Sequence, residues 1–197
     1  MDKKTVSDPV AIVVAVFSGL TLIIDLPPLI WHYKNKNLAA CLLIAWIMLL
    51  NLFAFTNAII WSSNDVEHWY DGQGLCDIEV KLFVGATVAL PLALLRIIRG
   101  LALVLGTKNG TCLTTLKDQR RRAALDILIC LICPSVLMIL HYIVQPNRYY
   151  IWRISGCQIS IDNSWVSVVL LLMWPLLITM IDSYYAGMCQ PTFTCVC

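Results

Sequence analysis

The sequence predicts an all-α integral membrane protein with five transmembrane helices. Three observations support this fold class. Of the 197 residues, 59% are hydrophobic and 13% are charged, whereas soluble domains carry roughly a quarter charged residues. The apolar residues lie in five segments of spanning length, and the basic residues concentrate in alternate connections between them. The chain therefore needs lipid around it, and its net charge of +2 gives no general basic surface for nucleic acid.

The first three predicted helices cover residues 10–31, 38–61 and 78–105. The first lies near the amino terminus, where a signal peptide would also lie. It is as long as a full span, about 20 residues, and shows no small-residue cleavage site. We therefore interpret it as a retained transmembrane helix.

The last two predicted helices cover residues 123–144 and 165–187. All five segments are continuously apolar, whereas the strands of a membrane barrel alternate between apolar and polar residues. A helix also satisfies every backbone polar group within the lipid. The prolines inside these spans either shape the bundle as fixed kinks or act as hinges; they are Pro27, Pro28, Pro91, Pro134 and Pro175.

The positions of Lys and Arg predict the orientation. The connection after the first helix carries Lys34 and Lys36. A longer basic set lies around the connection after the third helix: Arg96, Arg99, Lys108, Lys117, Arg120, Arg121 and Arg122. The connection over residues 62–77 is acidic and has no Lys or Arg. Because basic connections stay in the cytoplasm, the amino terminus is predicted to be extracellular, although Lys3 and Lys4 argue the other way.

This topology sorts the nine cysteines. It places Cys41, Cys130 and Cys133 in lipid and Cys112, Cys189, Cys195 and Cys197 on the reducing side. Only Cys76 and Cys157 face the oxidising exterior. We predict a disulfide between them, which would hold the connection before the fifth helix over the end of the bundle. The alternative is two free thiols.

The usual signatures of catalysis and of metal or cofactor binding are missing from the sequence, and its three histidines are far apart. We therefore predict no enzymatic activity and no cofactor. Cys130 and Cys133 form a C-x-x-C motif inside an apolar span, which favours packing over a soft-metal site. Polar residues within the spans are interpreted as interhelical contacts. They are Asp25, Asn51 and Asn57; Asp126 and Asp182 lie nearer the predicted cytoplasmic ends, where solvent or interfacial pairing accounts for them.

The predicted outer connections combine aromatic and charged side chains. Trp69 and Tyr70 stand among acidic residues, and Tyr149 and Tyr150 follow Arg148. Such residues form either an aromatic belt at the lipid interface or the mouth of a site for a partly apolar ligand. On the other side, the Arg120–122 run is either a topology anchor or a surface for an acidic partner or anionic lipid.

Several short motifs distinguish the chain further. They are LPPLIWH (26–32), NAIIW (57–61), WYDGQGLCDIEVKL (69–82), R-x-x-R-x-L-A (96–102), HYIVQ (141–145), RY (148–149), GCQ (156–158) and MWP (173–175). Together they resemble the fungal lipopeptide (a-factor type) mating-pheromone receptors, a class D family of G-protein-coupled receptors. The resemblance extends from about residue 10 to about residue 186.

The resemblance implies a multi-pass receptor of the plasma membrane for a farnesylated, carboxymethylated peptide pheromone, acting through a heterotrimeric G protein in mating. A receptor dimer is a further implied partner. The candidate ligand-facing residues are Trp69, Asp77, Glu79, Lys81, Tyr149, Tyr150 and Trp165. The candidate G-protein-facing residues are Lys34, Lys36, Arg96, Arg99, Arg120, Arg121 and Arg122.

The chain departs from this family in its number of helices, because family members have seven. We interpret residues 1–187 as a transmembrane receptor domain and residues 188–197 as a divergent cytoplasmic tail. The expectation is that the chain is incomplete and is truncated after its fifth helix. Two alternatives remain open: a dominant-negative or assembly partner of a full receptor, and a small transporter or channel.

Overall fold

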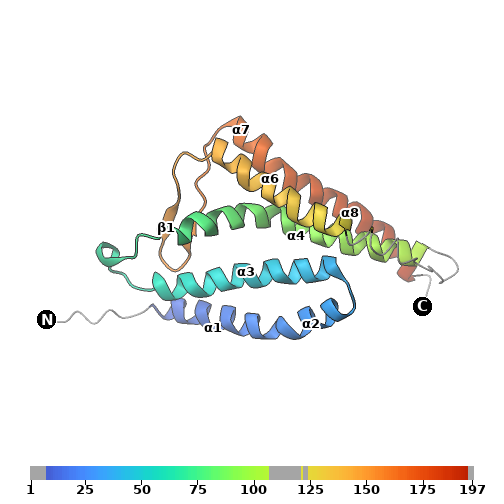
Figure 1. The fold of residues 1–197 in the computed structure, drawn as a ribbon, viewed down its shortest axis with the longest axis horizontal. Helices are drawn as coiled ribbons and strands as arrows, with labels where there is room; N and C mark the ends of the chain where they lie inside the picture. Colours follow the sequence, from blue (N-terminus) through green and yellow to red (C-terminus); the bar gives the residue numbers. More distant parts are fainter. Residues whose placement is uncertain (1–7, 107–120, 122–123, 195–197) are drawn as a thin grey trace.

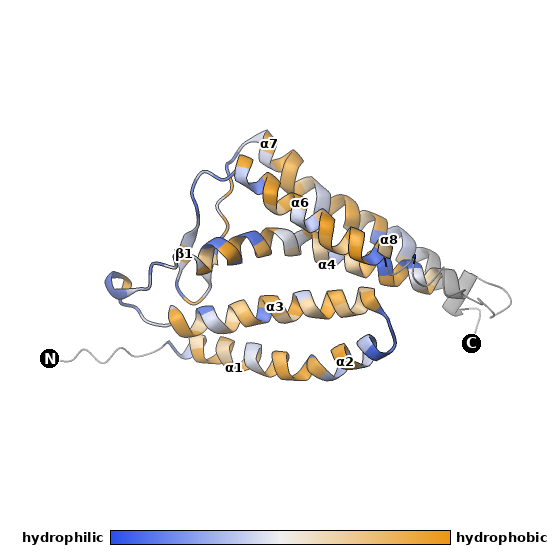
Figure 2. Ribbon diagram, viewed as in Figure 1, coloured by the Kyte–Doolittle hydropathy of each residue, from blue (hydrophilic) through white to orange (hydrophobic). Residues whose placement is uncertain are grey.

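The computed structural model describes residues 8–106, 121 and 124–194. Within them, five helical segments are long and apolar enough to cross a membrane. These are Pro9–Lys34, Leu38–Ile60, Leu75–Ala102, Ala124–Ile143 and Trp165–Gly187. The predicted all-α fold with five membrane-spanning helices is confirmed. Figure 2 shows apolar residues along the helices and polar residues concentrated in the connections at the two ends.

The first span is divided into two helices, α1 (Pro9–Ile24) and α2 (Leu26–Lys34), which meet at Asp25. The cause is the Pro27-Pro28 pair, because proline has no amide hydrogen to donate to the carbonyl four residues earlier. The Oδ2 atom of Asp25 is buried and has no hydrogen-bond partner among the described residues. The interhelical hydrogen bond expected of Asp25 is therefore missing from this part of the chain.

The central helix is α4 (Leu75–Gly106), which contacts α3 (Leu38–Ile60) on one side (Figure 1). On the other side it contacts α6 (Cys133–Leu140) and α8 (Met173–Thr194). Many of its buried residues are alanine or valine, among them Val84, Val88 and Ala93. Small side chains let helix backbones approach closely in lipid, where packing replaces the hydrophobic effect as the source of association. This composition explains why α4 occupies the middle of the bundle.

The fourth and fifth spans each contain a π-helical turn ahead of a proline. The turn η2 (Leu128–Ile132) precedes α6 (Cys133–Leu140), which contains Pro134. The turn η4 (Val168–Leu172) precedes α8 (Met173–Thr194), which contains Pro175. A proline ring clashes with the carbonyl four residues earlier in a regular helix, and a widened turn relieves that clash.

The connection between the fourth and fifth spans folds into a short antiparallel hairpin that sequence analysis does not predict. Its strands are β1 (Tyr150–Trp152) and β2 (Gly156–Gln158), and Ile151 pairs with Cys157. Figure 1 shows the hairpin beside one end of α3 and α4. The remaining short elements are η1 (Val66–His68), η3 (His141–Ile143) and α7 (Trp165–Ser167).

We call this part of the molecule the hairpin end, comprising residues 62–81 and 141–165. The opposite end contains the α2–α3 connection and the carboxyl end of α4 (Figure 1). Between the ends, apolar side chains such as Phe17 and Ile24, each 67% exposed, cover the outside of the bundle. Such residues are compatible with lipid as the surrounding solvent.

Candidate functional site

A disulfide between Cys76 and Cys157 anchors the hairpin, which confirms the predicted pairing. The S–S distance is 2.01 Å, and both cysteines are fully buried. Cys76 lies in the first turn of α4 and Cys157 in β2, so the bond attaches the hairpin to the central helix. Cys41, Cys130 and Cys133 are unpaired. Cys112, Cys195 and Cys197 lie outside the described residues, and only the backbone of Cys189 is described.

Hydrogen bonds fasten the tip of the hairpin to two other segments. The Ile154 amide donates to the carbonyl of Trp61 at 3.0 Å. The Arg153 guanidinium forms an ion pair with Asp8 and a hydrogen bond with Asn64. The Asp8 carboxylate also accepts from the Val10 amide at 2.9 Å and so caps α1. The hairpin is thereby connected to the first helix and to the loop after α3.

Tryptophans pack the loop beneath the hairpin. Trp61 is fully buried in a cluster with Cys76, Val80 and Cys157. Its indole N–H donates to the carbonyl of Tyr70 at 3.1 Å. Trp69, a candidate ligand-facing residue, packs against this cluster, and its indole N–H donates to the Ser63 carbonyl at 3.1 Å. Trp69 is half-buried and therefore stabilises the loop while part of its side chain stays accessible.

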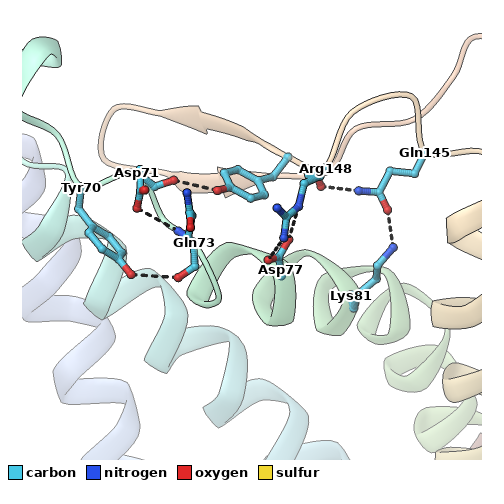
Figure 3. A network of polar contacts seen from close by, with 8 residues as sticks. Tyr70, Asp71, Gln73, Asp77, Lys81, Gln145 and Arg148 are labelled. Atoms are coloured by element: carbon cyan, nitrogen blue, oxygen red, sulfur yellow. Dashed lines mark hydrogen bonds and ion pairs between the residues drawn. The ribbon is translucent and has the colours of Figure 1, made fainter.

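Three of the candidate ligand-facing residues belong to one polar network, drawn in Figure 3. Arg148 pairs with Asp77 at 2.6 Å, and the Tyr149 hydroxyl donates to the Asp71 carbonyl at 2.9 Å. Lys81 donates to the Gln145 side chain at 2.5 Å, and Gln145 donates to the Arg148 carbonyl. The network joins the first turns of α4 to the connection before the hairpin.

Lys81 occupies an unusual position because its nearest polar neighbours are uncharged acceptors. Its ammonium lies 2.9 Å from Nδ1 of His141 and 3.5 Å from the ring centre of Tyr142. His141 is fully buried, and its Nε2 lies 3.0 Å from the Ser160 carbonyl. Lys81 donates to Nδ1, so the proton of a neutral His141 belongs on Nε2. None of the ion pairs among the described residues includes Lys81.

Glu79 lies apart from its neighbours Asp77 and Lys81. Residues four apart share a helix face, whereas the residue midway between them points to another side. Glu79 is fully buried and accepts a hydrogen bond from the Asn57 side chain of α3. Tyr150 accepts from the Asn147 amide at 2.6 Å. Trp165, at the start of α7, is 77% exposed.

Tyr149 is an ionisable member of the network and lies outside the spans, in the connection before the hairpin. Desolvation raises the pKa of its hydroxyl, and the nearby Asp77 and Asp71 carboxylates raise it further, against an opposing effect of Arg148. The phenol therefore remains protonated over the physiological range. It is available as the hydrogen-bond donor to the Asp71 carbonyl.

The candidate G-protein-facing residues divide into exposed and paired groups. Lys34, Lys36 and Arg121 are exposed. Arg99 is also exposed, and its guanidinium lies 5.7 Å from the ring centre of Tyr185. Arg96 is different: it pairs with Asp126 of the fourth span at 2.5 Å, and the two side chains are 14% and 15% exposed. Arg120 and Arg122 lie outside the described residues.

The polar residues predicted to join helices give mixed results. Asn57 joins α3 to α4 and to the hairpin, as predicted, through its bonds to Glu79 and to the Ser155 carbonyl. The prediction is wrong for Asn51, which donates to the Ile47 carbonyl of its own helix at 2.9 Å. Asp182 is buried away from solvent, and both of its carboxylate oxygens have no partner among the described residues, so neither the solvent contact nor the interfacial pairing expected of it is seen there.

His141, Tyr142 and Gln145 contact Lys81 but are not among the candidate residues predicted from the sequence. A signal for them was present, because His141 and Gln145 are four residues apart in the HYIVQ motif and helical spacing places them on one side. The fourth span continues through η3 before it ends, so both side chains reach Lys81.

These features define a multi-pass membrane protein whose bundle carries a disulfide-anchored hairpin at one end. Residues 13–195 match the family described as pheromone A receptor. The chain belongs to this family of fungal class D G-protein-coupled receptors, which confirms the resemblance found in its motifs. The family consists of receptors, so the prediction that the chain is not an enzyme is also confirmed.

Several curated fungal receptors are similar to the chain. The pheromone a factor receptor of Saccharomyces cerevisiae is 36% identical over 167 residues, covering 85% of this chain and 35% of that protein. The pheromone B alpha 3 receptor of Schizophyllum commune is 31% identical over 179 residues, covering 91% of this chain and 28% of that protein. The chain thus spans about a third of the length of these relatives. No solved structure matches the chain.

Proposed function

We propose that this chain forms the pheromone-receiving part of a G-protein-coupled receptor for a farnesylated mating peptide. The observation that carries the proposal is membership of the pheromone A receptor family over residues 13–195. The name of the Saccharomyces cerevisiae relative, pheromone a factor receptor, supports a peptide pheromone as the ligand class. The receptor acts in the plasma membrane, and its intracellular partner is a heterotrimeric G protein.

The hairpin end is the proposed extracellular, ligand-binding end. Its disulfide requires an oxidising compartment to form. The loop over residues 62–74 contains three acidic residues and no Lys or Arg, in agreement with an external position. The start of α1, where Asp8 is paired with Arg153 of the hairpin, is then extracellular too.

Exposed aromatic side chains beside a polar network suit a lipidated peptide. Tyr142, Trp152 and Trp165 are 69%, 65% and 77% exposed, and such rings offer apolar surface to a farnesyl chain. The Asp77–Arg148 pair and Tyr149 provide charged and hydrogen-bonding groups for the peptide itself. Lys34, Lys36, Arg99 and Arg121 provide the basic groups proposed to contact the G protein.

Binding of a minimal lipidated unit tests this assignment. We expect fluorescently labelled S-farnesyl-cysteine methyl ester to bind saturably to the full chain in lipid nanodiscs, above the uptake of empty nanodiscs. Replacing Trp165 with Ala should weaken binding about tenfold, because an aromatic contact of this size is worth roughly 1.5 kcal/mol.

The matched control is Trp31→Ala. Trp31 is 61% exposed, but it belongs to α2, at the opposite end. This substitution should leave binding unchanged. Equal losses for Trp165→Ala and Trp31→Ala, or uptake indistinguishable from that of empty nanodiscs, would count against the proposal.

A further inference from the structure

Asn57 and Glu79 form a buried polar contact between α3 and α4. Their side chains are 1% and 0% exposed. The Asn57 amide nitrogen donates to Oε1 of Glu79 and, at 3.0 Å, to the carbonyl of Ser155 in the hairpin. An amide nitrogen carries two hydrogens, so both donors of Asn57 are used. One side chain thereby holds two helices and the hairpin together.

Two acceptors in this contact have no donor. The Oδ1 atom of Asn57 and the Oε2 atom of Glu79 are both buried without a hydrogen-bond partner in the described part of the chain. Exchanging the amide oxygen and nitrogen of Asn57 does not remove the deficit, because the carbonyl of Ser155 is itself only an acceptor. An ionised carboxylate is likewise only an acceptor. A single hydrogen between Oδ1 and Oε2 would satisfy both atoms.

Charged neighbours do not supply that hydrogen. On α4, Asp77 is paired with Arg148, and Lys81 donates to Gln145 and lies against His141. The cation of the hairpin, Arg153, is bonded to Asp8 and Asn64. The α3 segment contains no Asp, Glu, Lys, Arg or His. Leaving a carboxylate ionised in such a buried site is costly, because no cation among the described residues pairs with its charge.

We infer that Glu79 is a neutral carboxylic acid that donates its proton from Oε2 to Oδ1 of Asn57. Together with the observed bond from Nδ2 to Oε1, this closes a ring of two hydrogen bonds between the acid and the amide. The second amide hydrogen then fixes Ser155, next to Gly156 and the bridged Cys157. Glu79 is thus a positioning residue that seats the hairpin through Asn57, without contacting a ligand itself.

The protonation state can be measured directly because the chain contains only two glutamates, Glu67 and Glu79. Full chain with the Glu67→Gln substitution, made by cell-free synthesis with ¹³C-carboxyl glutamate, carries a single labelled carboxyl group. At neutral pH in nanodiscs, its infrared spectrum should show the isotope-shifted C=O band of a protonated acid. That band should vanish in the Glu67→Gln/Glu79→Gln protein. A carboxylate band in its place would overturn the inference and indicate a site filled by water.

Two substitutions at Glu79 give an independent test. Glutamine reproduces the neutral acid, since its amide N–H can donate to Asn57 Oδ1 while its carbonyl accepts from Nδ2. We expect Glu79→Gln to melt within about 2 °C of the native chain, and Glu79→Leu to lose roughly 2–12 °C because it removes both the acceptor and the donor that Glu79 offers to Asn57. Equal losses for Gln and Leu would show that the site requires a negative charge and would refute a proton at Glu79.

Discussion

Removing the Cys76–Cys157 disulfide should lower the free energy of unfolding by roughly 2–5 kcal/mol. The bond closes a loop between residues 81 apart in the sequence, so it restricts the unfolded chain strongly. It also attaches the hairpin that covers Trp61, which is fully buried. We expect Cys76→Ala, Cys157→Ala and the double variant to be destabilised equally, as measured by denaturant unfolding of the full chain in mixed micelles.

Cys130→Ala is the matched control for this prediction. Cys130 is also fully buried, but its thiol is free. Its replacement gives the change in unfolding free energy that comes from losing a buried sulfur atom, without the loss of a disulfide. Destabilisation of the double variant by the sum of the two single effects would contradict a bond shared by the two cysteines. A loss no larger than that of Cys130→Ala would contradict it as well.

The second large effect is expected at Gly156, where Gly156→Ala should cost roughly 2–6 kcal/mol. Gly156 has a φ of +66°, a conformation that residues with a Cβ adopt only at a cost. An added Cβ would also lie 2.7 Å from the Cβ of Asn57 and closer still to its amide group. Asn57 has no freedom to move away, because its side chain is bonded to Glu79 and Ser155.

Gly74 separates the backbone cost from the steric cost. Its φ is +81°, and an added Cβ would meet no atom within 4 Å. Gly74→Ala should therefore cost only the backbone term, roughly 1 kcal/mol. The measurement is the midpoint of denaturant unfolding for both variants under identical conditions. If the two substitutions are equally destabilising, the hairpin does not pack on Asn57 as described.

The five helices and the disulfide were predictable because each depends on coarse features of the sequence. Long apolar segments require helices in lipid, and the alternation of basic connections places Cys76 and Cys157 on one side. Helical periodicity would also have separated Glu79 from Asp77 and Lys81. The sequence prediction grouped all three as ligand-facing, whereas the structure places Glu79 against Asn57.

The pairing of Arg96, the hairpin and the partners of the α3 asparagines depend on tertiary packing, which a single sequence does not reveal. Arg96 was predicted to face the G protein, but the packing of the third span against the fourth places it in an ion pair with Asp126. The turn of the hairpin has no strong sequence signal, because the residue with a positive φ at its tip is Ile154 and not a glycine. The turn is instead fixed by bonds to Trp61 and Asp8 from other segments. Nor does the spacing of Asn57 and Asn51 indicate which of them reaches another helix.

Photo-crosslinking tests most directly the central claim that the hairpin end receives a lipidated peptide. The probe is S-farnesyl-cysteine methyl ester carrying a diazirine in the farnesyl chain, applied to the full chain in nanodiscs and mapped by mass spectrometry. We predict adducts within residues 62–81 and 141–165 that excess unlabelled compound prevents. Adducts that concentrate around the α2–α3 connection, or that resist competition at the hairpin end, would contradict the account.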